Sequence, residues 1–316
     1  MARVEESIEV ELPEVQGQAS RIPLSLERVG VLDVKMPIAF MDFEGKLVSV
    51  VPSFDAFIDL PANLMGIHAS RSYEVITEAL GTYSGKPFKL EELCIEASRE
   101  LLRRHEYASR SEVRAKGEAV ISKLTPKSGA KTFETCDIYA SAASRRNGSR
   151  IIVERRRLGV GVMGLTACPC GKELVKSLAL KSLKSHGMPE DLADKLDELP
   201  LATHMQRSYG SILLDSPRPF SIDAMKLVDI IERSMSSPTY GLLKREDEAE
   251  VIVRSVSNPR FSEDVIRYMM AYLKGESDKI PGEAIATFSV RSLESIHKHD
   301  FYAEKSIKLK DIDLKP

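Results

Sequence analysis

The stretch KTFETCDIYASAASRRNGSRIIV, residues 131–153, predicts a β-hairpin. Residues 131–144 have the composition of an extended chain, and Asn147-Gly148 is a strong signal for a two-residue turn. Residues 151–153 begin a second strand, which continues toward Cys168. Antiparallel sheet is therefore expected at the centre of the chain.

Extended and helical segments alternate on both sides of this hairpin. Before it we expect a strand from Val29, a hairpin over 38–60 turning at Glu44-Gly45, helices from Ser72 and over 90–104, and an extended run over 106–124. After it we expect helices over 172–186, from Pro189, over 221–235 with Ser221 as N-cap, and from Asn258-Pro259 to Gly275. Extended runs are expected over 202–214 and 284–290, the latter as the last strand.

Each half of the chain thus runs strands, helices, strands. This order predicts an α+β fold of two fused modules, each an antiparallel sheet with helices on one face. We expect an N-terminal arm over 1–25, a first module over 26–158 and a second module over 159–316. No repeat is visible in the residues themselves, so the duplication rests on the element order.

Composition excludes several classes of protein. The 316 residues are 43% hydrophobic and 29% charged, which is typical of a soluble globular protein. A net charge of -2 gives no general attraction to nucleic acid or to an anionic membrane, so neither is expected as a partner. Acidic residues from Glu5 onward and the lack of a long apolar run favour a cytoplasmic protein. Four cysteines indicate reduced thiols or a metal site rather than a disulfide scaffold.

The segment Thr166-Ala-Cys-Pro-Cys-Gly-Lys-Glu173 carries the strongest chemical signal. In an extended chain Cys168 and Cys170 would face one spot, and the helix just beyond them can lower a thiol pKa. A buried pair of cysteines at a strand end explains the motif about equally well. His204, and Glu294 with His297 and His299, add ligand types that suit a divalent transition metal, which modestly favours a metal site.

A second group of residues suits an anion. Ser, His and Arg alternate in 66–72 and in 105–111, and an arginine lies shortly after His204. Arginine offers paired hydrogen bonds to phosphate, and serine and histidine add donors. Any one of these residues taken alone is better explained as a solvated polar side chain next to a loop. The candidates are His68, Ser70, Arg71, His105, Arg110 and Arg207.

The string Gly159-Val-Gly-Val-Met-Gly164 matches the dinucleotide-binding fingerprint. The next residues are Leu-Thr-Ala-Cys-Pro-Cys, and they do not begin a helix in the way that this fingerprint requires. We therefore expect these glycines in an irregular strand.

Several motifs together resemble the type IB GTP cyclohydrolase family. They are SLERVGV at 25–31, FIDLPA at 57–62, GIHASR at 66–71, HEYASR at 105–110, TACPC at 166–170, THMQR at 203–207, YGLLKREDE at 240–248, NPRFSED at 258–264 and ESIHKH at 294–299. They occur in the family's order from about residue 25 to the end. The long insert between Cys170 and His204 is similar to the archaeal branch.

The resemblance implies a tunnelling fold, whose subunits associate through their sheets as a homodimer or homotetramer with active sites near the interfaces. It implies a metal-dependent hydrolysis of GTP at C8 that opens the imidazole ring and releases formate. The archaeal branch uses Fe(II), although Mn or Zn can occupy such sites. It yields 7,8-dihydroneopterin 2′,3′-cyclic phosphate and diphosphate, for tetrahydromethanopterin biosynthesis.

The resemblance also assigns residues. Cys168, His204 and Glu248 correspond to the metal ligands and Cys170 to the catalytic thiol, with the roles of the two cysteines left open. Glu263 corresponds to the glutamate that binds guanine, and Glu294 and His297 to the catalytic end of the site. The chain departs from the family at Met205, Gly171 and Glu246, where Asn, Ser or Ala, and Pro are usual.

Two other functions fit the same residues. One is a different purine- or pterin-binding enzyme of the same fold, which release of formate from GTP would distinguish. The other is a non-catalytic nucleotide-binding protein with a structural metal, whose metal would be closed by four protein ligands.

Overall fold

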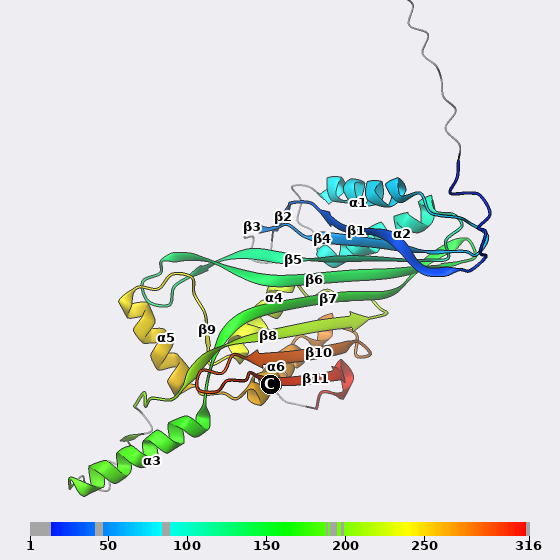
Figure 1. The fold of residues 1–316 in the computed structure, drawn as a ribbon. Coiled ribbons are helices and arrows are strands. Elements are labelled where there is room, and N and C mark those ends of the chain that lie inside the picture. The colour runs from blue at the N-terminus through cyan, green and yellow to red at the C-terminus, as the bar shows by residue number, and fades with distance from the viewer. Residues whose placement is uncertain are drawn as a thin grey trace, which may run out of the picture.

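A computed structural model describes residues 14–41, 47–83, 89–187, 189, 195–196 and 199–313. Within them, one 11-stranded sheet runs through the whole molecule in the order β1-β4-β5-β6-β7-β8-β10-β11, with β2, β3 and β9 attached to its side. All strand pairs are antiparallel, and the helices α1, α2, α4 and α6 lie along one face of the sheet (Figure 1).

The first half contains six strands and two helices. These are β1 (Leu26–Lys35), β2 (Ile38–Met41), β3 (Leu47–Val50), β4 (Ser53–Leu60), α1 (Ala69–Tyr83), α2 (Leu90–Arg104), β5 (Arg110–Leu124) and β6 (Lys131–Asn147). The second half contains β7 (Arg150–Ala167), α3 (Pro169–Ser185), β8 (Met205–Ser216), α4 (Ala224–Ser234), β9 (Ser237–Pro238), α5 (Arg245–Ser257), α6 (Ser262–Lys274), β10 (Ile285–Ser292) and β11 (Phe301–Lys308).

The central hairpin predicted from the sequence is confirmed. β6 pairs with β7 from Asn147 opposite Arg150, and Gly148 has φ 61°, a left-handed conformation that glycine adopts without steric cost. β5 and β6 stay in register from Arg110 opposite Arg145 to Leu124 opposite Lys131. These long strands are the centre of the sheet, and the other strands pair on either side of them.

One hydrophobic core lies between the sheet and its helices. Alternate residues of the strands face it, and Phe54, Ile138, Ile212 and Phe288 are fully or almost fully buried in a single cluster that spans both halves. The opposite face of the sheet carries ion pairs, such as Arg28 with Glu112. The expected α+β fold with helices on one face is confirmed.

With β2, β3, α3, β9 and α5 set aside, the order strand–strand–helix–helix–strand–strand repeats about the β6–β7 turn at Gly148. The division expected at 158/159 falls inside β7, where no break in the strand occurs. The element order therefore favours a module boundary near the turn, and the division of the chain into two modules stays a proposal.

Several boundaries differ from expectation. The strand at 284–290 is not the last, because β11 comes after it and pairs with β10 along its full length. The N-cap of α4 is Asp223, whose Oδ1 accepts from Met225 N at 2.7 Å, and not Ser221. α6 begins at Ser262, three residues after Pro259. The turn at 44–45 and most of the helix expected from Pro189 lie outside the described residues.

The glycines of 159–164 lie in β7, but the strand is regular there. It stays in register with β8 from Arg156 to Ala167, so the expectation of an irregular strand is wrong. In the described part of the chain, no helix combines the length and apolarity needed to cross a membrane.

Candidate active site

Cys168 lies at the junction of β7 and α3. It is the N-cap of α3, and its Sγ accepts a hydrogen bond from Gly171 N at 3.3 Å. Its backbone N–H donates to His204 O at 3.1 Å, and Thr203 Oγ1 donates to Cys168 O at 2.7 Å. The chain that leads into β8 is thereby bound to the first turn of α3.

Cys170 is exposed within that first turn. The extended run expected across the Cys-Pro-Cys motif ends at Cys168, because Pro169 is well suited to the first helical position. In a helix, side chains two positions apart point about 200° apart around the axis. The expectation that Cys168 and Cys170 face one spot relied on an extended chain, and the chain is not extended at Cys170.

His204 is linked to Glu294 through Gln206. His204 Nδ1 lies 3.0 Å from Gln206 Oε1, and Gln206 Nε2 donates to Glu294 Oε1 at 3.3 Å. The side chains of His204 and Glu294 are only 18% and 13% exposed. Gln206 Nε2 also donates to Oγ1 of Thr166 at 3.3 Å, and Thr166 is almost fully buried. The structure therefore brings a predicted ligand and a predicted catalytic acid into one hydrogen-bonded cluster.

Two of the three predicted metal ligands suit a divalent transition metal. The Cδ2 edge of His204, which carries Nε2, lies 3.4 Å from the position that a Cβ on Gly171 would take, and Gly171 N donates to Cys168 Sγ. The thiol and the unbonded imidazole nitrogen thus lie at the same helix turn. Among the described residues, however, no group of three or more His, Cys, Asp or Glu is arranged to hold a metal.

The remaining residues assigned to this end of the site are exposed. Glu248 lies in the first turn of α5 and Glu263 in the first turn of α6, and neither carboxylate has a hydrogen-bond or ion-pair partner among the described residues. Arg260 N donates to Ala167 O at 3.0 Å, which fixes the start of α6 beside β7. Arg207 lies opposite Leu165, and His297 stacks on His299 at 5.2 Å.

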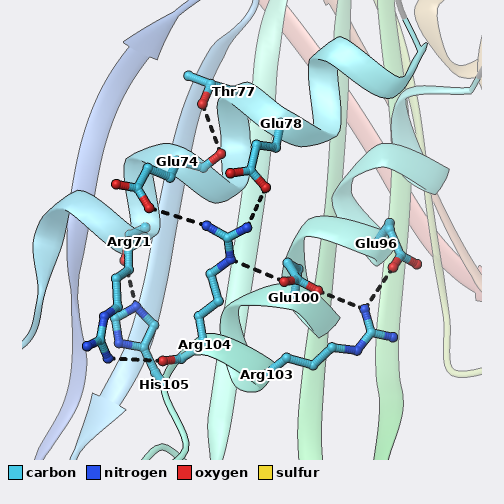
Figure 2. A network of polar contacts seen from close by, with 10 residues as sticks. Arg71, Glu74, Thr77, Glu78, Glu96, Glu100, Arg103, Arg104 and His105 are labelled. Carbon is cyan, nitrogen blue, oxygen red and sulfur yellow. Dashed lines mark hydrogen bonds and ion pairs between the residues drawn. The ribbon is translucent and has the colours of Figure 1, made fainter.

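The phosphate candidates His68, Ser70, Arg71 and His105 lie elsewhere, where α1 begins and α2 ends. His68, Arg71, Arg104 and Tyr107 line part of a cavity of about 290 Å³. Figure 2 shows that Arg104 pairs with Glu74, Glu78 and Glu100, whereas the one hydrogen bond of the Arg71 guanidinium to a described residue goes to the backbone oxygen of Arg104 at 3.2 Å. Arg71 thus keeps a charge that no described carboxylate pairs, and His68 pairs with Glu14 at 3.1 Å.

His105 is fully buried, and both of its ring nitrogens are occupied. Nδ1 lies 3.0 Å from Tyr107 Oη and Nε2 lies 3.3 Å from Ser72 Oγ. Burial, together with nearby Arg71, His68 and Arg104, lowers the pKa of His105 to about 4, so the ring is neutral near pH 7. This geometry favours a positioning role for His105 rather than a direct contact with phosphate.

Arg110 lies apart from this cavity, at the start of β5. Its backbone N–H donates to Asp59 Oδ1 at 2.7 Å, and it lines a different cavity of about 830 Å³ together with Arg28, Arg155 and Asp215. The six phosphate candidates are therefore divided among three places, because Arg207 lies at the Cys168 end.

The two ends of the site are separated by the length of β7. Arg110 lies opposite Arg145, which lies opposite Ile152 near the start of β7, whereas Cys168 comes directly after its last residue. Fifteen residues of extended strand span about 50 Å. Figure 1 shows the same separation, with α3 at one end of the sheet and the junction of α2 and β5 at the other.

Gln206, Thr166 and Tyr107 contribute to these clusters, although the sequence assigned them no role. His204 directly precedes β8 and Gln206 is the second residue of that strand, so an extended chain places the two side chains on one side, where they hydrogen bond. This spacing from His204 is the feature of the sequence that could have identified Gln206 as part of the site. No such feature of the sequence marks Tyr107.

Comparison with known proteins gives a match to the family described as type I GTP cyclohydrolase folE2 over residues 12–303. GTP cyclohydrolase MptA 1 of Methanocella arvoryzae is 38% identical over 298 residues, covering 94% of this chain and 93% of that protein. GTP cyclohydrolase MptA of Methanococcus aeolicus is 35% identical, covering 95% and 97%. The protein of the same name from Methanosarcina mazei is 37% identical, covering 93% and 94%.

Among solved structures, the fold is similar to that of a hyperthermostable mutant of the urate oxidase from Bacillus sp. TB-90. The TM-score is 0.50 at 9% identity, covering 90% of this chain and 99% of that one. A structure of a highly active BTUO mutant gives a TM-score of 0.51 at 8% identity, with the same coverage. At such low identity these likenesses show the fold alone, which is the tunnelling fold.

Proposed function

The chain belongs to the type I GTP cyclohydrolase family, and on that premise we propose that it hydrolyses GTP at C8, opening the imidazole ring and releasing formate. The proposed product is 7,8-dihydroneopterin 2′,3′-cyclic phosphate, with diphosphate, for tetrahydromethanopterin biosynthesis. The observation that carries this proposal is the hydrogen-bonded group of His204, Gln206 and Glu294, which the bond from Cys168 N to His204 O joins to the start of α3.

We propose a divalent metal, Fe(II) in the first place, held by Cys168, His204 and Glu248. A bound metal supplies Lewis acidity that activates a water toward C8. The thiol and the free nitrogen of His204 support two of these ligands, and Glu248 stays a prediction. Glu294, largely shielded from solvent beside His204, can act as a proton donor or acceptor, and exposed His297 and Cys170 can exchange protons with the opened ring.

Two groups of residues are proposed to bind GTP. The carboxylate of Glu263 has no described partner and can accept the N1–H and the 2-amino group of guanine together. Arg71, with His68, Ser70, Arg110 and Arg207, supplies cationic or hydroxyl contacts for the triphosphate, and His105 positions this cluster.

The separation of these groups supports a homo-oligomer in which one site uses residues of two subunits. A GTP molecule is much shorter than β7, so residues at the two ends of one chain cannot hold the same nucleotide. Residues at the start of α1 in one copy would then complete the Cys168 cluster of another. Whether the assembly is a dimer or a tetramer does not alter this requirement.

The test is an anaerobic incubation of the purified protein with GTP and Fe(II), with formate measured and the pterin product identified by mass. Formate together with the cyclic phosphate is the expected result. Formate with a triphosphate product would correct the product alone. GTP left intact under these conditions would overturn the proposed activity.

A further inference from the structure

Gln206 hydrogen bonds to both His204 and Glu294, whose Nδ1 and Oε2 atoms are 4.0 Å apart. Its Oε1 lies 3.0 Å from His204 Nδ1, and its Nε2 lies 3.3 Å from Glu294 Oε1 and 3.3 Å from Thr166 Oγ1. Ser295 Oγ also approaches Oε1, at 3.5 Å. Gln206 is thus the only described side chain that hydrogen bonds to both His204 and Glu294.

The chemistry of the neighbours fixes the direction of the Gln206 amide. An ionised carboxylate only accepts hydrogen bonds, so the NH₂ group of Gln206 must face Glu294. Its carbonyl oxygen then faces His204. A carbonyl oxygen also only accepts, so His204 must carry its proton on Nδ1.

A neutral histidine protonated on Nδ1 keeps its lone pair on Nε2. In His204 that nitrogen is bonded to Cδ2, which lies beside Gly171 in the first turn of α3. Gln206 therefore leaves the free electron pair on the ring edge next to Gly171, whose N–H donates to the Cys168 thiol. The amide also donates to the buried hydroxyl of Thr166, which in turn hydrogen bonds to the buried hydroxyl of Ser208 at 2.7 Å.

We propose that Gln206 is a positioning residue that fixes His204 as its Nδ1–H tautomer and couples the orientation of His204 to that of Glu294. Its consequence for metal binding rests on the proposed function, in which His204 is a ligand. Partners of this kind on a ligating histidine change metal affinity about 10- to 100-fold.

The first measurement concerns the tautomer in the metal-free full-length protein. Imidazole ¹⁵N signals are recorded at a pH where histidines are neutral, and those of His204 are identified by their loss in His204→Ala. Wild type should show the Nδ1–H form. Gln206→Met, which removes both the acceptor and the donor, should populate the Nε2–H form. Gln206→Glu retains an acceptor and should restore Nδ1–H.

The second measurement is Co(II) affinity, determined by competition with a chelator. Gln206→Met should bind Co(II) about 10- to 100-fold more weakly, whereas Gln206→Glu should stay close to wild type. Ser295→Ala, which removes a hydroxyl near Oε1 without changing the amide, should leave the tautomer unchanged.

Retention of the Nδ1–H form in folded Gln206→Met would overturn the inference, as would unchanged Co(II) affinity. If that variant fails to fold, a loss of the Nδ1–H form in Gln206→Glu would overturn it instead. Because the tautomer is measured without metal or GTP, its outcome is independent of formate release, which tests the proposed activity.

Discussion

At the scale of single residues, Gly161 shows how a missing side chain positions a polar pair. A Cβ on Gly161 would overlap the hydroxyl of Tyr209, which lies across the glycine and donates to Asp137. Burial, and then the hydrogen bond and charge of Asp137, raise the pKa of the Tyr209 phenol. The glycine string that imitates a nucleotide fingerprint therefore has a packing role here.

Gly161→Ala should push Tyr209 off the strand and break its bond to Asp137. Overpacking of this kind costs about 1–3 kcal/mol, seen as a lower melting temperature. The pKa of Tyr209, measured by ultraviolet titration, should fall toward that of an ordinary tyrosine. Gly81→Ala is the matched control, because a Cβ there meets nothing within 4 Å and α1 should gain slightly. An unchanged titration in Gly161→Ala would contradict this account.

A substitution of Glu263 tests whether this single residue recognises guanine. Glu263→Gln keeps the shape of the side chain but places a donor against a guanine N–H, so the GTP KM should rise on the order of 10- to 100-fold. Metal content and melting temperature should stay near wild type. If Glu263 merely complements the dipole of α6, the variant will instead lose a little stability and keep its KM.

At the scale of elements, Asp247 joins α5 to the β5–β6 loop. It is fully buried and accepts from Lys127 N at 2.9 Å, Ser128 N at 2.9 Å, Ser128 Oγ at 2.7 Å and Lys244 N at 3.0 Å. Burial alone would raise its pKa, but these donors hold the pKa well below its usual value of 3.8. The charged form is therefore part of the folded structure.

Asp247→Asn should lower the melting temperature at neutral pH, because one acceptor becomes a donor facing N–H groups. A carboxyl whose pKa is depressed by folding stabilises above its unfolded pKa and loses that contribution on acidification. The difference from wild type should therefore shrink as the pH falls below 3.8. Glu246→Gln, exposed in the same helical turn, is the control and should change little. A difference that is constant with pH would contradict this role.

Elements were predictable where burial is periodic. The bounds of α2 can be read from the sequence because Leu93, Ala97 and Leu101 all face the core. α5 was missed because few of its residues are buried, so its apolar positions form no clear stripe. β11 was missed because none of its residues is buried, so its sequence shows no apolar–polar alternation, and only its pairing with β10 defines it.

At the scale of the whole molecule, Glu91 lies where the helix layers of the two halves approach each other. It belongs to the first turn of α2, and its Oε1 has no hydrogen-bond partner although the side chain is buried. Burial raises its pKa from 4.5 to about 7, and the charges of Glu92 and of Asp223 at the start of α4 add to this while Lys89 opposes it. Folding thus favours the protonated acid.

A carboxyl with a raised folded pKa stabilises fully below its unfolded pKa, and that stability is lost as the pH rises through the folded value. Wild type should therefore weaken between pH 4.5 and about 7. Glu91→Gln stays neutral and should be more stable above this range, on the order of 3 kcal/mol at most. Denaturant unfolding at several pH values measures this, with exposed Glu92→Gln as control. Parallel pH profiles for wild type and Glu91→Gln would exclude Glu91 as the cause.

The candidate site could be predicted from sequence only as a set of residue types. Motifs identified Cys168, His204 and Arg71, but their distances depend on the length and register of β7, which no local pattern encodes. Likewise, the burial of His105 arises from Ser72 and Tyr107 closing over it. Convergence of distant residues is a property of the assembled sheet and, on the proposed function, of two subunits.

A composite site predicts that two inactive variants can restore each other. His204→Ala removes the Cys168 end of a site, and Arg71→Ala removes the phosphate end, about 50 Å away along the same chain. A mixed dimer would contain one site with both ends intact. Random assembly from equal amounts should therefore recover about one quarter of wild-type turnover.

The control for this experiment is a mixture of His204→Ala with Cys168→Ala. Both changes lie at the same end of the site, joined by the bond from Cys168 N to His204 O, so every site in a mixed dimer would keep at least one defect. Differently tagged chains, purified through both tags, establish that mixed assemblies form. If such assemblies of His204→Ala with Arg71→Ala release no formate while wild type does, then Arg71 does not complete the Cys168 cluster of a neighbouring subunit, and the phosphate-binding role must pass to cations at the Cys168 end, of which Arg207 is the first to test.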